Sequence, residues 1–136
     1  MKTLLLTSIL FMVSSLFGGQ TIYDSTTSLL WQDSKENAKL SMTYAKAQNY
    51  CSKLVIDKHS DFRIPTMNEL QSIIDYKNYD PAIIKGFEYV SNEAYWSTTP
   101  FADDDKVVWL IHFKRGERYV KDKHYDRYIR CVQTSK

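Results

Sequence analysis

The 136-residue chain contains two cysteines, Cys51 and Cys131, and no others. A bond between them would tie an early element of the fold to the last one, across eighty positions of the chain. Such a bond forms and persists in oxidising compartments, whereas cytosolic thiols stay reduced. The compartment therefore decides what the cysteines do, and the N-terminal sequence indicates the compartment.

The first nineteen residues have the layout of a secretory signal peptide. Lys2 provides a basic start, residues 4–17 are apolar apart from small hydroxyl residues, and no further charge appears before Asp24. The 14-residue apolar run is shorter than the roughly 20 residues that span a bilayer, which disfavours an uncleaved membrane anchor. We expect residues 1–19 to be a signal peptide, with cleavage after Ser15 as the alternative. Residues 20–136 then form one exported domain, periplasmic or extracellular.

In an oxidising compartment Cys51 and Cys131 are expected to pair, because no third thiol competes. The chain-entropy treatment of so long a loop gives about 4–5 kcal/mol of stabilisation as an upper figure. A redox role is disfavoured because the chain has no Cys-x-x-Cys. A zinc site is disfavoured because His59, His112 and His124 show no ligand spacing. We predict a structural disulfide and no cofactor.

Helical spacing of apolar residues predicts a first helix over 41–54, which places Cys51 on the inner face. A second helix is expected where Thr66 and Glu69 form a capping box ahead of an apolar run. A short helical turn is expected over 80–86.

The strand signals lie at the two ends of the chain. We expect strands over 21–24, 29–32, 95–98, 107–113, 118–121 and 128–133. Helices early and strands late favour an α+β domain, with two helices packed on a twisted, mainly antiparallel sheet. The N-terminal strands are expected to join the C-terminal strand, so that the disulfide links the first helix to the last strand.

The segment 61–75, DFRIPTMNELQSIID, resembles the D-W-R-L-P-T-x-x-E-L signature of the Lcl C-terminal domain family. Phe62 stands where the family usually has tryptophan. Further matches follow in order at 29–33, 50–51, 95–100, 108–113 and 128–132, so the resemblance extends over most of the chain after the signal peptide.

The resemblance implies a C-type-lectin-like fold with two helices, a twisted sheet and a disulfide from helix to last strand. It also implies a location at a bacterial surface, and the adhesin that gives the family its name binds sulfated glycosaminoglycans. This chain lacks the collagen-like stalk of that adhesin. A lectin-like fold does not by itself imply sugar binding.

The formal charge of +2 conceals an uneven distribution. Residues 20–113 carry nine basic and 13 acidic side chains, whereas residues 114–136 carry eight basic and three acidic ones. The near-neutral total excludes a generally cationic, nucleic-acid-binding protein. The local basic excess favours an anionic partner for the C-terminal part, and the alternative is that the two parts neutralise each other within one fold.

Tyrosines 119, 125 and 128 are interleaved with these basic residues and could stack on sugar rings. Guanidinium groups suit sulfate and phosphate. The alternative is that the basic side chains are solvated on strand faces, with Arg130 paired to an internal acid. The predicted anion-binding residues are Lys114, Arg115, Arg118, Lys121, Lys123 and Arg127.

Asp103, Asp104 and Asp105 form the one acidic cluster in which calcium binding is conceivable. Adjacent aspartates more often lie in a solvated turn, so they remain a weak metal candidate. Arg63 with Asp61 and Glu69 is better explained as a buried structural ion pair behind the Pro65 turn than as an acid–base site. No catalytic triad, zinc motif or glycine-rich phosphate loop is present in the sequence, which indicates no enzyme activity.

These observations predict an exported, non-catalytic domain that recognises anionic glycans, sulfated or phosphorylated, in surface adhesion. The alternative is a protein-binding envelope module or inhibitor without a glycan ligand, because ten tyrosines and three tryptophans suit a protein interface equally well. Neither hypothesis involves nucleic acid or a stable membrane span after signal cleavage, and both leave the oligomeric state open.

Overall fold

The strands at the two ends of the chain form one sheet, as predicted. The computed structural model describes residues 20–135, so the predicted signal peptide lies outside the described residues. Strands β1 (Thr21–Asp24) and β2 (Leu29–Gln32) pair antiparallel through a short polar turn, and β2 then pairs with β8 (Val132–Thr134). The predicted meeting of the N-terminal and C-terminal strands is confirmed.

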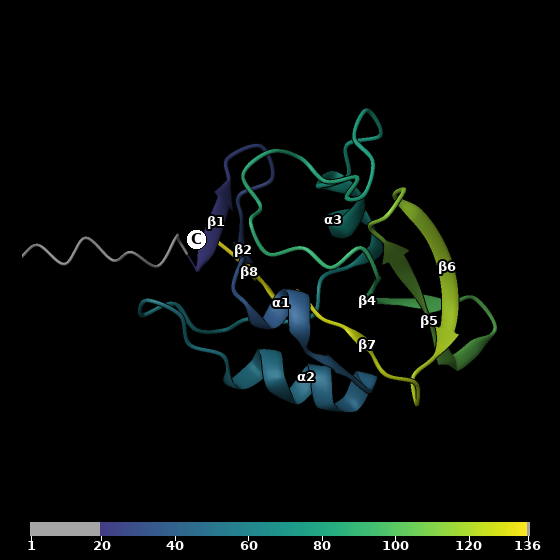
Figure 1. Ribbon diagram of the computed structural model, residues 1–136. Helices are drawn as coiled ribbons and strands as arrows, with labels where there is room; N and C mark the ends of the chain where they lie inside the picture. Colours follow the sequence, from purple (N-terminus) through teal and green to yellow (C-terminus); the bar gives the residue numbers. More distant parts are fainter. Residues whose placement is uncertain (1–19, 136) are drawn as a thin grey trace, which may run out of the picture.

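The second sheet contains five strands in the order β3-β7-β4-β5-β6 (Figure 1). It is mixed, because β4 runs parallel to β7 while the other neighbours pair antiparallel. Strand β6 lies at its edge and forms a twisted ribbon with β5. The strands are β3 (Ser41–Met42), β4 (Ala94–Phe101), β5 (Asp104–His112), β6 (Glu117–Asp122) and β7 (Arg127–Tyr128).

The described chain has three short helices, α1 (Glu36–Lys39), α2 (Tyr44–Lys53) and α3 (Met67–Ser72). Helix α1 has no counterpart among the predicted elements. Helix α2 begins three residues later than predicted, because Ser41 and Met42 are extended and pair with β7. Helix α3 begins at the predicted capping box: Thr66 Oγ1 accepts from the Glu69 N–H, and the Glu69 carboxylate accepts from the Thr66 N–H.

Two other expectations about local structure are wrong. The segment 80–86 forms no helical turn; the Ala82 N–H donates to the Phe113 carbonyl instead, and Ile83 bridges to Ile74. The predicted strand 128–133 is divided into β7 and β8, which belong to different sheets. The residues between them are buried, so the chain crosses from one sheet to the other through the core.

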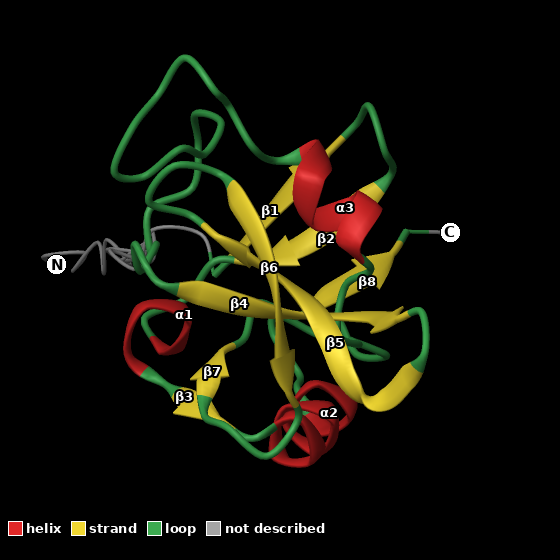
Figure 2. Cartoon of the chain, turned by 90° about the vertical axis from the view of Figure 1, so that its right-hand side faces the viewer, coloured by secondary structure: helices red, strands yellow, loops and turns green. Residues whose placement is uncertain are grey.

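The core has two parts, one on each face of the β4–β5 pair. Ile111 of β5 belongs to a cluster that includes Leu70 of α3, whereas Leu110 belongs to a cluster that includes Ala47 of α2. Successive side chains of a strand point to opposite faces, which explains this division. Figure 2 shows α3 and α2 on opposite sides of these strands. Within residues 20–135, no helix is long and apolar enough to cross a membrane.

The disulfide between Cys51 and Cys131 is present, with a Cα–Cα distance of 5.5 Å. It joins α2 to the residue immediately before β8, so the predicted link between the first long helix and the last strand is confirmed. Both cysteines are fully buried. The bond therefore ties the α2 side of the core to the three-stranded sheet.

Candidate ligand-binding site

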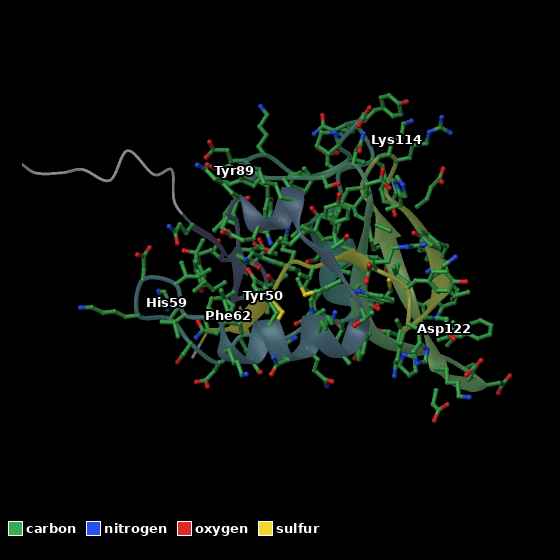
Figure 3. The ribbon with its side chains drawn as sticks, turned by 60° about the horizontal axis from the view of Figure 1, so that its bottom comes forward. Tyr50, His59, Phe62, Tyr89, Lys114 and Asp122 are labelled. Carbon is green, nitrogen blue, oxygen red and sulfur yellow. A yellow bond between two sulfur atoms is a disulfide. The ribbon has the colours of Figure 1, made fainter. Side chains whose placement is uncertain are left out.

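The six predicted anion-binding residues divide into groups at the two ends of β6. Lys114 and Arg115 lie in the turn between β5 and β6, and Arg118 lies near the start of β6. The other three residues, Lys121, Lys123 and Arg127, lie at the end of β6 and on the segment after it. Figure 3 shows Lys114 and Asp122 at opposite ends of this strand. The six residues of β6 extend over about 17 Å, at 3.3–3.4 Å per residue. The sequence prediction thus combines two separate places.

The register of β6 also separates Arg118 from Lys121. Arg118 lies opposite Ile111 of β5, and Lys121 lies opposite Val108. Residues directly opposite one another share a face of the sheet, and faces alternate along a strand. Arg118 therefore points to the α3 side of the sheet and Lys121 to the α2 side.

Three cations gather around two tyrosines near the N-terminal end of α2. The Lys121 Nζ lies 4.2 Å and the Arg127 Cζ 5.8 Å from the centroid of the Tyr125 ring. The Lys123 Nζ lies 4.8 Å from the centroid of the Tyr44 ring. Cations within about 6 Å of an aromatic centroid are attracted by the ring quadrupole. We call these five residues the basic–tyrosine cluster.

None of the three cations has a carboxylate within ion-pairing distance among residues 20–135. The nearby Asp122 is instead held by His124, whose backbone N–H and ring Nδ1 lie 2.8 and 2.7 Å from the carboxylate. The hydrogen bond from the His124 N–H is the main reason that the pKa of Asp122 is lowered. Among the described residues the three cations therefore lack a carboxylate partner, and the Arg127 guanidinium donates to the Asp126 carbonyl oxygen at 2.6 Å.

Two of the three tyrosines named from the sequence lie outside this cluster. Tyr128 is half-buried beside Tyr95, and Tyr119 is half-buried beside His112. The helical spacing of Tyr44 predicts a core residue and gives no sign of a contact with a cation. In the structure its ring packs edge-on against Trp96, and the Lys123 ammonium lies over the same ring. The contact between Tyr44 and Lys123 depends on how α2 lies against the segment between β6 and β7, so only the tertiary structure shows it.

Arg115, in the turn between β5 and β6, lies near a different tyrosine. The Arg115 guanidinium lies 5.8 Å from the centroid of Tyr79, whose side chain is exposed. Gly116 ends the turn at φ +74°, and a Cβ there would approach Ile74 Cγ2 to 2.7 Å. Only glycine suits this position, because both its conformation and its space exclude a side chain. The turn is thereby fixed on the loop that follows α3.

Arg130 belongs to the interior, in agreement with the alternative considered for it. Its guanidinium lies 3.2 Å from the Asp33 carboxylate, and both side chains are buried. It also donates to the carbonyl oxygens of Gln32, at 2.7 Å, and Tyr89. Arg130 is therefore structural.

The second expected ion pair, between Arg63 and Glu69, is also present, but it is not buried as expected, because the Arg63 side chain is 40% exposed. The Arg63 guanidinium binds the Glu69 carboxylate in a bidentate arrangement, at 2.6 and 2.8 Å. Arg63 additionally donates to Thr134 Oγ1, at 2.9 Å, so the pair connects the start of α3 to the end of β8. This position explains the pair as a structural connection.

The acidic run lies at the turn between β4 and β5. Asp103 is in the turn, Asp104 and Asp105 begin β5, and all three are exposed. Over residues 20–135, no three His, Cys, Asp or Glu side chains are gathered in a way that could hold a metal ion. The three aspartates therefore do not converge into a ligand set.

The described fold and the basic–tyrosine cluster define a disulfide-bridged α+β domain with three cations and two tyrosines beside its edge strand. The sequence profile of the family described as "Lcl C-terminal domain" matches residues 20–133, and the chain belongs to this family. No curated protein matches the sequence.

Proposed function

We propose that this protein is an exported, non-catalytic domain that binds anionic glycans through the basic–tyrosine cluster, in adhesion at the cell surface. The observation that carries the proposal is that Lys121, Lys123 and Arg127 surround two tyrosines without a carboxylate partner among the described residues. Ammonium and guanidinium groups pair with sulfate or phosphate, and aromatic rings provide an apolar surface for a sugar.

Two further features support this proposal. The buried disulfide fits an oxidising compartment, as export requires. We also propose that the fold is C-type-lectin-like, and this is supported by the helices on a twisted mixed sheet and by the disulfide from α2 to the last strand. We assign the glycan contacts to the α2 side of the sheet, because Lys121 points there and Arg118 does not.

Retention on immobilised heparin, eluted with a salt gradient, tests the proposal. We expect the wild type to be retained at low salt and the triple variant Lys121→Ser/Lys123→Ser/Arg127→Ser to elute much earlier. The matched control is Lys58→Ser/Lys77→Ser/Lys85→Ser, which removes the same charge from exposed lysines elsewhere and should elute close to the wild type. Desulfated heparin keeps only its uronate carboxylates and should therefore retain the wild type and the control variant much more weakly, because the sulfates provide most of the attraction.

Two results would contradict the proposal. If the wild type passes through heparin at low salt, the domain has no affinity for this class of ligand. If the two triple variants elute together, retention reflects net charge and the cluster has no particular role. Melting temperatures of both variants close to that of the wild type would show that the fold is retained.

A further inference from the structure

The C-terminal end of α2 carries a second surface, outside the basic–tyrosine cluster. Two hollows of about 430 and 390 Å³ lie there, and Tyr50, Leu54 and Val55 line both of them. The Val55 side chain is 66% exposed although it is aliphatic. Figure 3 places Tyr50 well away from Asp122 at the end of β6. The two surfaces share no residue.

The charges around these hollows are mainly positive. Lys35 and one acid, Glu36, line the first hollow. Lys46 and Lys53 line the second hollow, and no acid is among its lining residues in the described part of the chain. Within the described part of the chain, none of the three lysines has a carboxylate within ion-pairing distance. A hydrogen bond with the Ser34 side chain is the main reason that the pKa of Glu36 is lowered. The surface therefore has an unbalanced positive charge around an apolar centre.

The hydroxyl group of Tyr50 adds a hydrogen-bond donor with a defined role. Gln32 is fully buried, and its amide oxygen accepts from the Cys131 N–H, at 3.2 Å, which defines which end of the amide is NH₂. The two hydrogens of that NH₂ go to Ser34 Oγ and Tyr50 Oη, both at 2.9 Å. Tyr50 Oη is thus an acceptor toward Gln32, and its own hydrogen has no acceptor among residues 20–135. That hydrogen is free for a ligand in the hollow that Tyr50 lines.

We propose that this surface docks an acidic segment of a partner protein that also carries an aliphatic side chain. The segment's carboxylates would pair with the lysines and accept from the Tyr50 hydroxyl, while its aliphatic side chain would pack against Leu54 and Val55. Complementary charge around a small apolar centre is the composition of protein docking sites. Leu54 and Val55 line both hollows, so an aliphatic side chain of a peptide would find an apolar contact beside the lysines.

Fluorescence anisotropy with labelled synthetic peptides tests this proposal. The probe peptide has Asp and Glu on both sides of a leucine, and its two controls replace the leucine by serine or the acids by lysine. We expect binding of the probe, weaker binding of the serine peptide and no binding of the lysine peptide. Val55→Asp should weaken probe binding by about tenfold or more, because it places a negative charge at the apolar centre.

The matched control is Tyr79→Asp, which adds the same charge at another exposed apolar residue and should leave the affinity unchanged. Tyr50→Phe should weaken binding by about tenfold, the effect of one hydrogen bond to a charged group. Heparin retention of Val55→Asp should equal that of the wild type, which separates this proposal from the glycan proposal. A melting temperature close to that of the wild type would show that each variant is folded.

Two outcomes would overturn the proposal. The first is absence of probe binding at low salt. The second is an equal loss of affinity in Val55→Asp and Tyr79→Asp. If the probe does not bind and sedimentation with phosphatidylglycerol vesicles depends on Val55, this surface is assigned to anionic lipid instead.

Discussion

The guanidinium of Arg130 lies 3.2 Å from the carboxylate of Asp33, and both side chains are almost completely buried. The Arg130 Cζ also lies 4.9 Å from the centroid of the Phe87 ring and 5.7 Å from that of the Tyr95 ring. The Asp33 carboxylate in turn accepts hydrogen bonds from the backbone N–H groups of Glu88 and Tyr89, at 2.9 and 3.0 Å. This ion pair therefore joins the end of β2, the loop before β4 and the segment that carries the disulfide.

Replacement of Asp33 by alanine should destabilise the protein by about 3–5 kcal/mol, because it leaves the Arg130 charge buried without its partner. The backbone N–H groups of Glu88 and Tyr89, which donate to Asp33, would lose their acceptor as well. Chemical denaturation monitored by tryptophan fluorescence measures this change. A loss below about 1 kcal/mol, the range of a surface substitution, would contradict the structural role given to the pair.

The double variant Asp33→Ala/Arg130→Met provides the control for this prediction. The Nε of Arg130 has no hydrogen-bond partner among the described residues, so the ion pair is not fully satisfied in the native state. Removing both charges should be less harmful than the sum of the single changes, with a coupling energy of about 1–3 kcal/mol. Strictly additive effects would show that the two side chains do not act on each other.

Removal of the disulfide by Cys51→Ala/Cys131→Ala should lower the free energy of unfolding by up to about 4–5 kcal/mol, because the denatured chain is then free of a long covalent loop. The two cysteines are eighty positions apart, and both side chains are buried. Urea denaturation of the oxidised wild type and the double variant measures the difference. Unchanged stability, or free thiols in the purified wild type, would contradict this prediction.

Stability at low pH should depend on Glu69. Partial burial raises the pKa of this carboxyl group, but hydrogen bonds from Arg63 and from the Thr66 N–H together outweigh burial, so that the pKa is lowered. The resulting stabilisation is present above the unfolded-state pKa of about 4.3. It is lost as the pH falls through the lower pKa of the folded state, when the carboxylate takes up a proton.

Glu69→Gln should therefore be less stable than the wild type at neutral pH, by about 1 kcal/mol, since solvent screens a pair whose Arg63 side chain is 40% exposed. The difference should shrink as the pH is lowered from 5 toward 3, the range of about one unit either side of the reference pKa. Glutamine retains the capping box, so the change isolates the charge. Melting temperatures across this range measure the effect, and a difference independent of pH would contradict it.

Elements with a local signal were predictable from the sequence. Thr66 and Glu69 are three positions apart, and their capping box starts α3 at the expected place. Strands β1 and β2 are short apolar runs joined by a polar turn, and they occupy the predicted residues. In both cases the interacting groups are near neighbours in the chain, so the amino-acid pattern already contains the interaction.

Elements that depend on distant partners were not predictable. The run 128–133 has the pattern of one strand, yet the structure divides it, because Arg130 turns into the core to meet Asp33. Ser41 and Met42 have a helical pattern with the residues that follow, yet they pair with β7. Pairing with a strand far along the chain overrides local propensity in such cases.

The candidate site likewise has features that the sequence predicts and features that depend on contacts between distant segments. The basic excess of residues 114–136 is a property of the sequence, and so is the presence of tyrosines among them. The register of β6 against β5 decides which cations lie on the same face of the sheet, and it directs Lys121 and Arg118 to opposite faces. The approach of Tyr44 to Lys123 depends on how α2 lies against the β6–β7 segment.

The amino-acid sequence by itself determined the family, the α+β class and the one possible disulfide, because these depend on residue identity, order and local spacing. Only the tertiary structure decided which charges are buried and paired and which have no carboxylate partner among residues 20–135. Arg130 and Lys121 are both cations in the same basic segment, yet one is enclosed beside Asp33 and the other lies over Tyr125. Burial and pairing are set by contacts between segments that are far apart in the chain, so composition and spacing do not contain them.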